Sequence, residues 1–259
     1  MLKGKTAVIY GAGGSIGGAV ARAFAAAGAM VFLTGRNAGA LQLVADGIIG
    51  AGGKAEIGVV DAQDEQAVIN HLEKLGSIDI SFNATATEVV QGLPLMDMSA
   101  VDYMNPVTMM LQTRFFTAKA AAKLMAVQGS GVILSLTATP GGIGYPYTGG
   151  FAAACCAIEN FAQNLALEIG IYGVRVVNIR SGGSPDSKVF KDAMHKAPII
   201  MATELGRMQA DTMLKKMPLM ADIANVAVFL ASEMAGSITG VTVDVTAGTT
   251  AGLNYRVVK

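Results

Sequence analysis

Charged side chains are scarce in this chain of 259 residues: they make up 15% of it, and the formal net charge at pH 7 is +0. A nucleic-acid-binding surface needs a basic face, so no nucleic acid partner is expected. Cysteine is scarce too, and the two that are present, Cys155 and Cys156, are adjacent. Neighbouring side chains on a helix point apart, so we expect no disulfide between these two cysteines. The low cysteine content predicts a reducing, cytoplasmic setting.

Apolar runs that could cross a membrane are also lacking, although residues 124–158 carry no charged side chain. The length of this run would permit a span. Its glycines, prolines and hydroxyl groups break any continuous helix, however, so we expect a buried strand, a loop and an apolar helix there. Residues 1–5 lead directly into a strand and show no signal peptide, so neither a membrane nor a secretory route is expected.

Apolar residues make up 52% of the chain, enough for a large core in a single α/β domain over residues 1–259. Short β-favouring runs alternate with helical patterns. Strands are expected over residues 6–10, 31–34, 55–60, 79–86, 131–137, 174–179 and 241–245, and helices over residues 17–28, 38–50, from 64, 100–127 with an interruption near Pro106, 151–167 and 221–232. This alternation predicts a Rossmann-type, doubly wound parallel sheet of seven strands with helices on both faces.

A cluster of glycines follows the first predicted strand and opens the first predicted helix, in the order Gly11, Ala12, Gly13, Gly14, Ser15, Ile16 and Gly17. Such a turn points backbone N–H groups and the positive end of a helix dipole at one spot, which suits a phosphate. Glycine is required because a Cβ would keep a pyrophosphate away from the backbone. The sequence therefore predicts a nucleotide phosphate site here.

The end of the second predicted strand indicates which dinucleotide binds. An acidic residue there would hydrogen-bond the adenosine ribose hydroxyls and select NAD. This chain has Gly35 and Arg36 instead, and a guanidinium can hold a 2′-phosphate through two hydrogen bonds. We therefore expect NADP(H) in preference to NAD(H), with a solvent-exposed loop arginine as the alternative interpretation.

The spacing Gly11-x-x-x-Ser15-x-Gly17 resembles that of the short-chain dehydrogenase/reductase family, with Ser15 in place of the middle glycine. The run from Phe229 to Ser232, followed by Ile238-Thr-Gly240, resembles a further part of the family pattern, and the resemblance covers nearly the whole chain. It implies a variable substrate lid at about residues 184–220. It also implies that the cofactor is held by Gly11, Gly13, Ser15, Ile16, Gly17, Arg36, Asp61, Ala62, Asn83, Ala84 and Gly182.

Some of these positions have a second interpretation. In the family an aspartate at Asp61 hydrogen-bonds the adenine edge, but Asp61 could also cap the helix that begins near Asp64. Asn83 could tie neighbouring strands together, while residues 84–86 present backbone to the cofactor ribose. His71, inside the helix after Asp64, is expected at the surface.

The family carries its chemistry on a Ser, a Tyr, a Lys and an Asn. Counted from the strand at residues 131–137, the first three positions hold Ala138, Phe151 and Cys155; counted back from Thr117, the Asn position holds Met110. A phenylalanine transfers no proton, and residues 124–187 contain no lysine. A tyrosine near these positions, with no cation beside it, would keep a pKa of about 10 and would transfer protons poorly at pH 7.

Replacement candidates for the proton donor are Tyr147 and Tyr145, on the loop before Phe151, and Thr137, beside Ala138. Cys155 would need a lowered pKa to act as a nucleophile, and its alanine-rich surroundings favour a packed apolar thiol. The remaining candidates are His195 in the lid, and Arg114 and Arg180, each of which could hold an anionic substrate but is interpreted first as a surface or salt-bridged residue.

Three functions stay open. The first is an NADP(H)-dependent oxidoreductase of the short-chain type that uses a non-standard proton route on a small, apolar carbonyl, enone or imine substrate. The second is a non-catalytic nucleotide-binding relative, a scaffold or sensor, and the third is a non-redox enzyme that reuses the cleft. The resemblance implies a homo-oligomer, tetramer or dimer, built through the helices of residues 105–125 and 151–167; no metal ion is expected.

Six methionines lie in and just after the predicted lid. They could line an apolar substrate pocket or a subunit contact, or they could simply fill the hydrophobic core. They are Met194, Met201, Met208, Met213, Met217 and Met220.

Overall fold

The computed structural model describes residues 1–252, and in them seven parallel strands form one sheet in the order β3-β2-β1-β4-β5-β6-β7. This confirms the predicted doubly wound, Rossmann-type fold. The strands are β1 Thr6–Tyr10, β2 Met30–Gly35, β3 Lys54–Val59, β4 Ile80–Asn83, β5 Gly131–Ala138, β6 Val174–Ser181 and β7 Val241–Val245.

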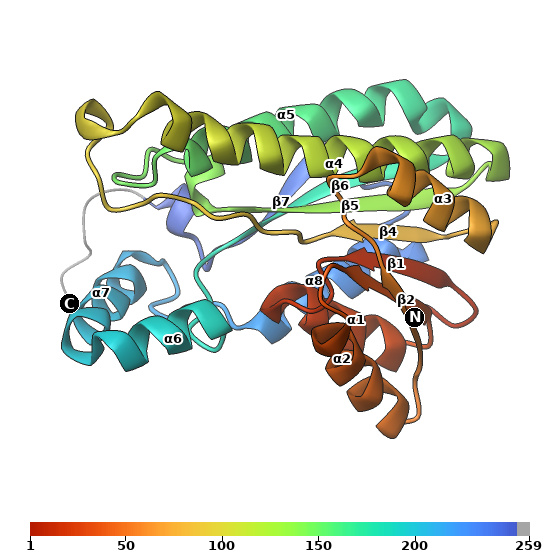
Figure 1. Cartoon of the computed structure of the whole chain (residues 1–259), viewed down its shortest axis with the longest axis horizontal. Coiled ribbons are helices and arrows are strands. Elements are labelled where there is room, and N and C mark those ends of the chain that lie inside the picture. The colour runs from red at the N-terminus through yellow and green to blue at the C-terminus, as the bar shows by residue number, and fades with distance from the viewer. Residues whose placement is uncertain (253–259) are drawn as a thin grey trace.

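Helices connect the strands and cover both faces of the sheet (Figure 1). The α-helices are α1 Ser15–Ala26, α2 Ala38–Gly50, α3 Glu65–Leu75, α4 Ala100–Gln128, α5 Gly150–Ile169, α6 Lys188–Lys196, α7 Pro198–Asp211 and α8 Met220–Ala231. Short 3-10 turns lie at Leu95–Asp97, Thr139–Gly141, Gly170–Tyr172, Glu233–Ala235 and Thr249–Ala251. In Figure 1, α3, α4 and α5 lie above the sheet and α1, α2 and α8 below it, while α6 and α7 stand to one side.

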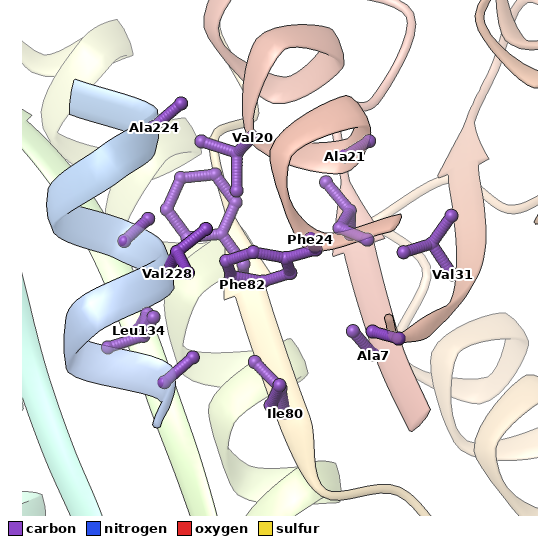
Figure 2. Packing of buried hydrophobic residues seen from close by; sticks show 14 of the residues in the cluster. Ala7, Val20, Ala21, Phe24, Val31, Ile80, Phe82, Leu134, Ala224 and Val228 are labelled. Carbon is purple, nitrogen blue, oxygen red and sulfur yellow. The ribbon is translucent and has the colours of Figure 1, made fainter. Parts of the chain in front are cut away.

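The core has one layer on each face of the sheet. Below it, Phe24 of α1 meets Phe82 of β4 edge to face, with ring centroids 6.4 Å apart, and Val228 of α8 closes the cluster from the other side (Figure 2). Above it, α3, α4 and α5 bury a second cluster around Val8, Ala121 and Met125. Alanines in α1, α4, α5 and α8 let these helices approach closely, which explains how so few aromatic side chains fill a sheet of this size.

The order of the strands reverses between β1 and β4. β2 and β3 extend the sheet to one side of β1, and β4 to β7 extend it to the other. In an open parallel sheet this reversal leaves a crevice at the carboxyl ends of the two central strands, where ligands bind. Gly11 follows β1 and Ala84 follows β4 at this edge.

Three local predictions were wrong. α4 runs without a break through Pro106, because a proline in the second turn removes one backbone hydrogen bond and leaves the rest of the helix bonded. β4 ends at Asn83, because the Thr85 amide donates to the Asn83 side chain and not to a neighbouring strand. His71 is half-buried, with its ring against Phe32 at a centroid distance of 6.5 Å.

The region after β6 forms two helices, and Pro198 at the first position of α7 separates them. Among residues 1–252, none of the helices has both the length and the apolar character that crossing a membrane requires.

Candidate functional site

The glycine turn after β1 packs against the chain that follows β4. Gly11 has φ +78°, and a Cβ on it would lie 2.9 Å from the backbone of Ala84 and Thr85. A Cβ on Gly17 would lie 2.3 Å from the carbonyl oxygen of Gly11. Both glycines are therefore needed for the turn itself, whereas Gly13 and Gly14 face solvent and leave backbone open to a ligand.

Two helices begin at this turn. α1 starts at Ser15, and its N-cap Gly14 has no side chain to satisfy the first N–H groups. α6 starts at Lys188, and the Ser187 side chain does not cap it either. The backbone N–H of Lys188 donates to the Ser15 hydroxyl oxygen at 3.0 Å, so the two positive helix ends meet at one residue. Such a place fits a diphosphate, and Ile16 lies half-buried beneath it.

Arg36 lies at the end of β2 with its side chain exposed, and among residues 1–252 it has no hydrogen bond or ion pair. The next residue, Asn37, caps α2 by accepting from the Ala40 amide at 3.0 Å. Because the cap does not involve Arg36, the guanidinium is available to an external anion. This geometry is compatible with the predicted 2′-phosphate contact, which stays a prediction.

The residues after β3 correct one interpretation. Asp64, not Asp61, caps α3, and its carboxylate accepts from the Ala67 amide at 3.0 Å. Asp61 accepts from the Gln63 amide at 3.0 Å and so shapes the turn before the helix. Ala62 is buried beside it. The predicted adenine contacts of Asp61 and Ala62 stay predictions.

A buried polar cluster lies behind the end of β4. The amide nitrogen of Asn83 donates to the Thr117 hydroxyl at 2.9 Å and to the Thr113 carbonyl at 3.2 Å, while its oxygen accepts from the Thr85 amide at 2.9 Å. Asn83 thus ties β4 to α4. The sequence had suggested instead that it ties neighbouring strands together. Because its amide is fully used, only backbone at Ala84 and Thr85 is left to face a cofactor.

Arg114 belongs to the same cluster and is not at the surface. Its side chain is buried, with 3% of the residue exposed, and its guanidinium donates to Thr85 and to the carbonyl oxygen of Leu136. Burial lowers the pKa of Arg114 to about 10. Among residues 1–252 no carboxylate pairs with it, so both interpretations of Arg114, surface or salt-bridged, were wrong.

The first turns of α5 are apolar where they meet α4. Phe151 packs against a cluster that contains Met110, Ala154 and Ile158. Cys155 is fully buried, and burial raises the pKa of its thiol to about 11. The thiol is therefore protonated at neutral pH, as the apolar interpretation predicted.

The candidate proton donors lie in three different environments. Tyr147 is 58% exposed and has φ +62°, while its carbonyl oxygen accepts from the Gly92 amide at 2.8 Å. Tyr145 is half-buried, and burial, followed by the charges of Asp211 and Glu204, raises its pKa. The pKa shift of Tyr145 is therefore opposite to what proton transfer at pH 7 requires. Thr137 is buried and hydrogen-bonded on both sides.

Thr137 leads into an ionic cluster that the sequence interpretation missed. Its hydroxyl donates to Glu159 of α5 at 2.8 Å. The Arg180 Nε donates to the same Glu159 at 3.0 Å, and its Nη1 donates to Asp244 at 2.8 Å. Two carboxylates thus neutralise Arg180, which confirms it as salt-bridged and argues against a role in holding an anionic substrate. The available signal was Glu159 lying one turn after Cys155 on an otherwise uncharged helix face.

The loop after β6 and residues 184–220, the predicted substrate lid, lie on this side of the site. The Gly182 amide donates to the Val245 carbonyl at 2.9 Å, which fixes the loop to β7. A Cβ on Gly183 would lie 2.8 Å from Met208 and 3.0 Å from Met217, so these two lid methionines fill space against the loop. His195 is exposed on α6 and bonds to the Lys191 carbonyl of its own helix.

The cavity that borders the polar cluster is small. About 10 Å³ of it is open to the centre of a water molecule, and it is lined by Ser81, Asn83, Arg114, Thr117, Ala118, Ile133, Leu134, Ser135, Phe161, Ala162 and Val176. A space of this size admits a water but no substrate.

Comparison with known proteins assigns the family. A family model described as enoyl-(acyl carrier protein) reductase matches residues 11–250. The chain is 30% identical over 257 residues to the 7alpha-hydroxysteroid dehydrogenase of Escherichia coli, covering 98% of this chain and 97% of that protein. It is 32% identical over 259 residues to tropinone reductase-like 1 of Erythroxylum coca, covering 95% and 90% respectively.

Solved structures agree. A protein from Beutenbergia cavernae, assigned as an NAD(P)-dependent gluconate 5-dehydrogenase and holding NADP at low occupancy, superposes with a TM-score of 0.85 at 28% identity, covering 97% of this chain and 98% of that one. Levodione reductase shares the fold, with a TM-score of 0.90 over 98% of this chain and 100% of that one at 24% identity. The chain belongs to the short-chain dehydrogenase/reductase family of oxidoreductases.

Proposed function

We propose that this chain is an NADP(H)-dependent oxidoreductase that reduces or oxidises a small, apolar carbonyl, enone or imine compound by a non-standard proton route. The observation that carries the proposal is the meeting of two helix starts at Ser15, where α1 has no side-chain cap and where Gly13 and Gly14 leave backbone exposed to a ligand. A solved relative that holds NADP gives further support. The bound cofactor would supply or accept a hydride at its nicotinamide ring.

Each part of the cofactor has residues that fit it. Backbone in the glycine turn would hold the diphosphate, and Arg36, which has no partner in the described part of the chain, would hold the 2′-phosphate. The remaining contacts follow the family resemblance: adenine at Asp61 and Ala62, the nicotinamide ribose at the backbone around Asn83 and Ala84, and the nicotinamide itself near Gly182.

The substrate class follows from the apolar residues that the family resemblance puts beside the nicotinamide end. Phe151, Cys155 and Met110 lie there in the resemblance, and none of them offers a charged proton donor. A simple ketone needs a proton at its oxygen as the hydride arrives. A protonated imine already carries its proton, and an enone forms an enolate that takes a proton from solvent afterwards. The site therefore favours imine or conjugated substrates over simple ketones.

The test combines binding with turnover. NADPH and NADH are titrated by calorimetry, and loss of nicotinamide absorbance is then followed with ketone, enone and imine panels. We expect turnover of an enone or imine that survives Cys155→Ala, because a buried thiol takes no part in it. If Tyr147→Phe or Tyr145→Phe abolishes turnover, that tyrosine is the donor; turnover confined to simple ketones contradicts the proposed substrate class.

A second candidate is a non-catalytic nucleotide-binding protein. It is favoured by the residues where the resemblance places the family's chemistry: Ala138, Phe151 and Met110 have no ionisable group, and the buried Cys155 thiol stays protonated at neutral pH. Tight NADPH binding without turnover on any panel would support it, whereas a non-redox enzyme would convert a substrate without changing the nicotinamide absorbance.

We also propose that the chain acts as a single-domain homo-oligomer in the cytoplasm. Apolar side chains exposed on α4 and α5 support an interface, with Phe115 44%, Val127 89% and Leu167 77% exposed. Phe115 also packs edge to face on Phe161 of α5, at a centroid distance of 5.9 Å, so the two helices present one surface. Analytical ultracentrifugation of the wild type and of Leu167→Glu tests this, and a monomeric wild type contradicts it.

A further inference from the structure

Arg114 joins the carboxyl ends of two central strands. Its Nη1 donates to the carbonyl oxygen of Thr85 and to the Thr85 hydroxyl, each at 2.8 Å. Its Nη2 donates to the carbonyl oxygen of Leu136 at 3.3 Å. Thr85 follows β4 and Leu136 lies in β5, so one guanidinium holds both strands at the edge where the crevice opens.

Within residues 1–252, no counter-ion contacts the guanidinium of Arg114. All of its acceptors are neutral carbonyl or hydroxyl oxygens, and its Nε, which is buried, has no partner among residues 1–252. Arg180 differs, because Glu159 and Asp244 neutralise it. A buried charge without a counter-ion is screened little and acts on whatever binds next to it.

The charge lies close to the crevice. The amide nitrogen of Thr85 would be 2.9 Å from a Cβ on Gly11, so the residue that Arg114 holds is itself packed against the glycine turn. On the other side, Arg114 and Cys155 lie near enough for each to affect the pKa of the other. Arg114 therefore stands between the start of α5 and the chain that borders the ligand.

We propose that Arg114 gives the nicotinamide end of the crevice a permanent positive potential and makes the site bind the reduced cofactor in preference to the oxidised one. This inference rests on the proposed function. The oxidised nicotinamide ring carries one positive charge and the reduced ring carries none, while the rest of the two molecules is identical. Two unit charges about 12 Å apart at an effective dielectric constant of about 20 change a binding ratio by about tenfold.

The experiment measures the dissociation constants of NADPH and NADP⁺ by calorimetry for the wild type, Arg114→Met and Arg114→Lys. We expect the wild type to bind NADPH more tightly than NADP⁺. The ratio of the NADP⁺ constant to the NADPH constant should fall about tenfold in Arg114→Met. It should be retained in Arg114→Lys, because the charge is kept. A purely structural role would weaken both ligands together and leave the ratio unchanged.

Arg175 provides a matched control. Among residues 1–252 its guanidinium also binds only backbone carbonyl oxygens, those of Leu230, Ser232 and Ile238, but it lies near the start of β6, at the opposite edge of the sheet from the crevice. We expect Arg175→Met to lower the unfolding temperature and to leave the ratio of the two dissociation constants as in the wild type.

The outcomes separate the two proposals. A wild type that binds neither dinucleotide overturns both the proposed function and this inference. An unchanged ratio in Arg114→Met, with both ligands bound, overturns the inference alone. Should Arg114→Met fail to fold, as judged by circular dichroism, Cys155→Asp keeps the arginine and sets a carboxylate near it, and the same loss of the ratio is then expected.

Discussion

Replacing Arg36 by alanine should change which dinucleotide this chain binds. The guanidinium is exposed and has no partner within residues 1–252, so no internal bond has to break before it meets a 2′-phosphate. A charge-assisted hydrogen bond contributes roughly 1.5–3 kcal/mol, and solvent exposure at this position places the total near the lower end, at about 2 kcal/mol. That corresponds to an increase of about 30-fold in the dissociation constant of NADPH.

The same substitution should leave NADH binding unchanged, because NADH has no 2′-phosphate to lose. Titration calorimetry of both ligands, at low and at moderate salt, measures the effect, which should shrink as salt screens the exposed contact. Arg207→Ala is the matched control, since Arg207 is an exposed arginine on α7 that pairs with Glu204 of the same helix. A dissociation constant for NADPH that stays within twofold of the wild type in Arg36→Ala would refute the assignment of this residue.

Three further predictions concern the site and its supports. Gly17→Ala should abolish NADPH binding and lower the unfolding temperature, because its Cβ would lie 2.3 Å from the Gly11 carbonyl oxygen; retained binding by calorimetry contradicts the turn geometry. Arg180→Met should lower the free energy of unfolding by about 3 kcal/mol, since it leaves the largely buried Glu159 carboxylate without this ion pair, whereas replacing both Arg180 and Glu159 by leucine should cost far less; if the losses of the two single variants simply add up in the double variant, measured by urea unfolding, the two residues are not coupled. Because burial raises the pKa of Cys155 to about 11, the unfolded thiol ionises first as pH rises past about 9, and the wild type should lose up to about 2 kcal/mol relative to Cys155→Ala by pH 11; parallel pH curves would show that this thiol is not buried.

Much of the fold followed from periodicity in the sequence. The strands were short apolar runs punctuated by glycine, and the helices carried alanine on their buried faces, so the predicted alternation of strands and helices matches the observed seven-stranded sheet. The errors came where a side chain overrides the local pattern. Asn83 ends β4 through a hydrogen bond to Thr85, which a strand pattern does not encode, and Pro106 is tolerated because it lies early in a long helix.

The site was less predictable, because its polar contacts join distant segments. Arg114 meets Thr85 and Leu136 across 29 and 22 residues of sequence, and neither partner is charged, so no pattern of opposite charges pointed to it. Glu159 and Arg180 are 21 residues apart and meet only because α5 packs over β6. The glycine turn was predictable because its chemistry is local.

The bond between the Lys188 amide and the Ser15 hydroxyl has a consequence for the order of events at this site. It joins the start of α6 directly to the glycine turn, so we expect a ligand bound at one of these segments to change the binding free energy at the other, and by linkage the two effects are equal. A compound that presses on α6 or α7 would thereby change how tightly the diphosphate end is held. Kinetics with a compulsory sequence, dinucleotide before substrate, would be the outward sign of that shared contact.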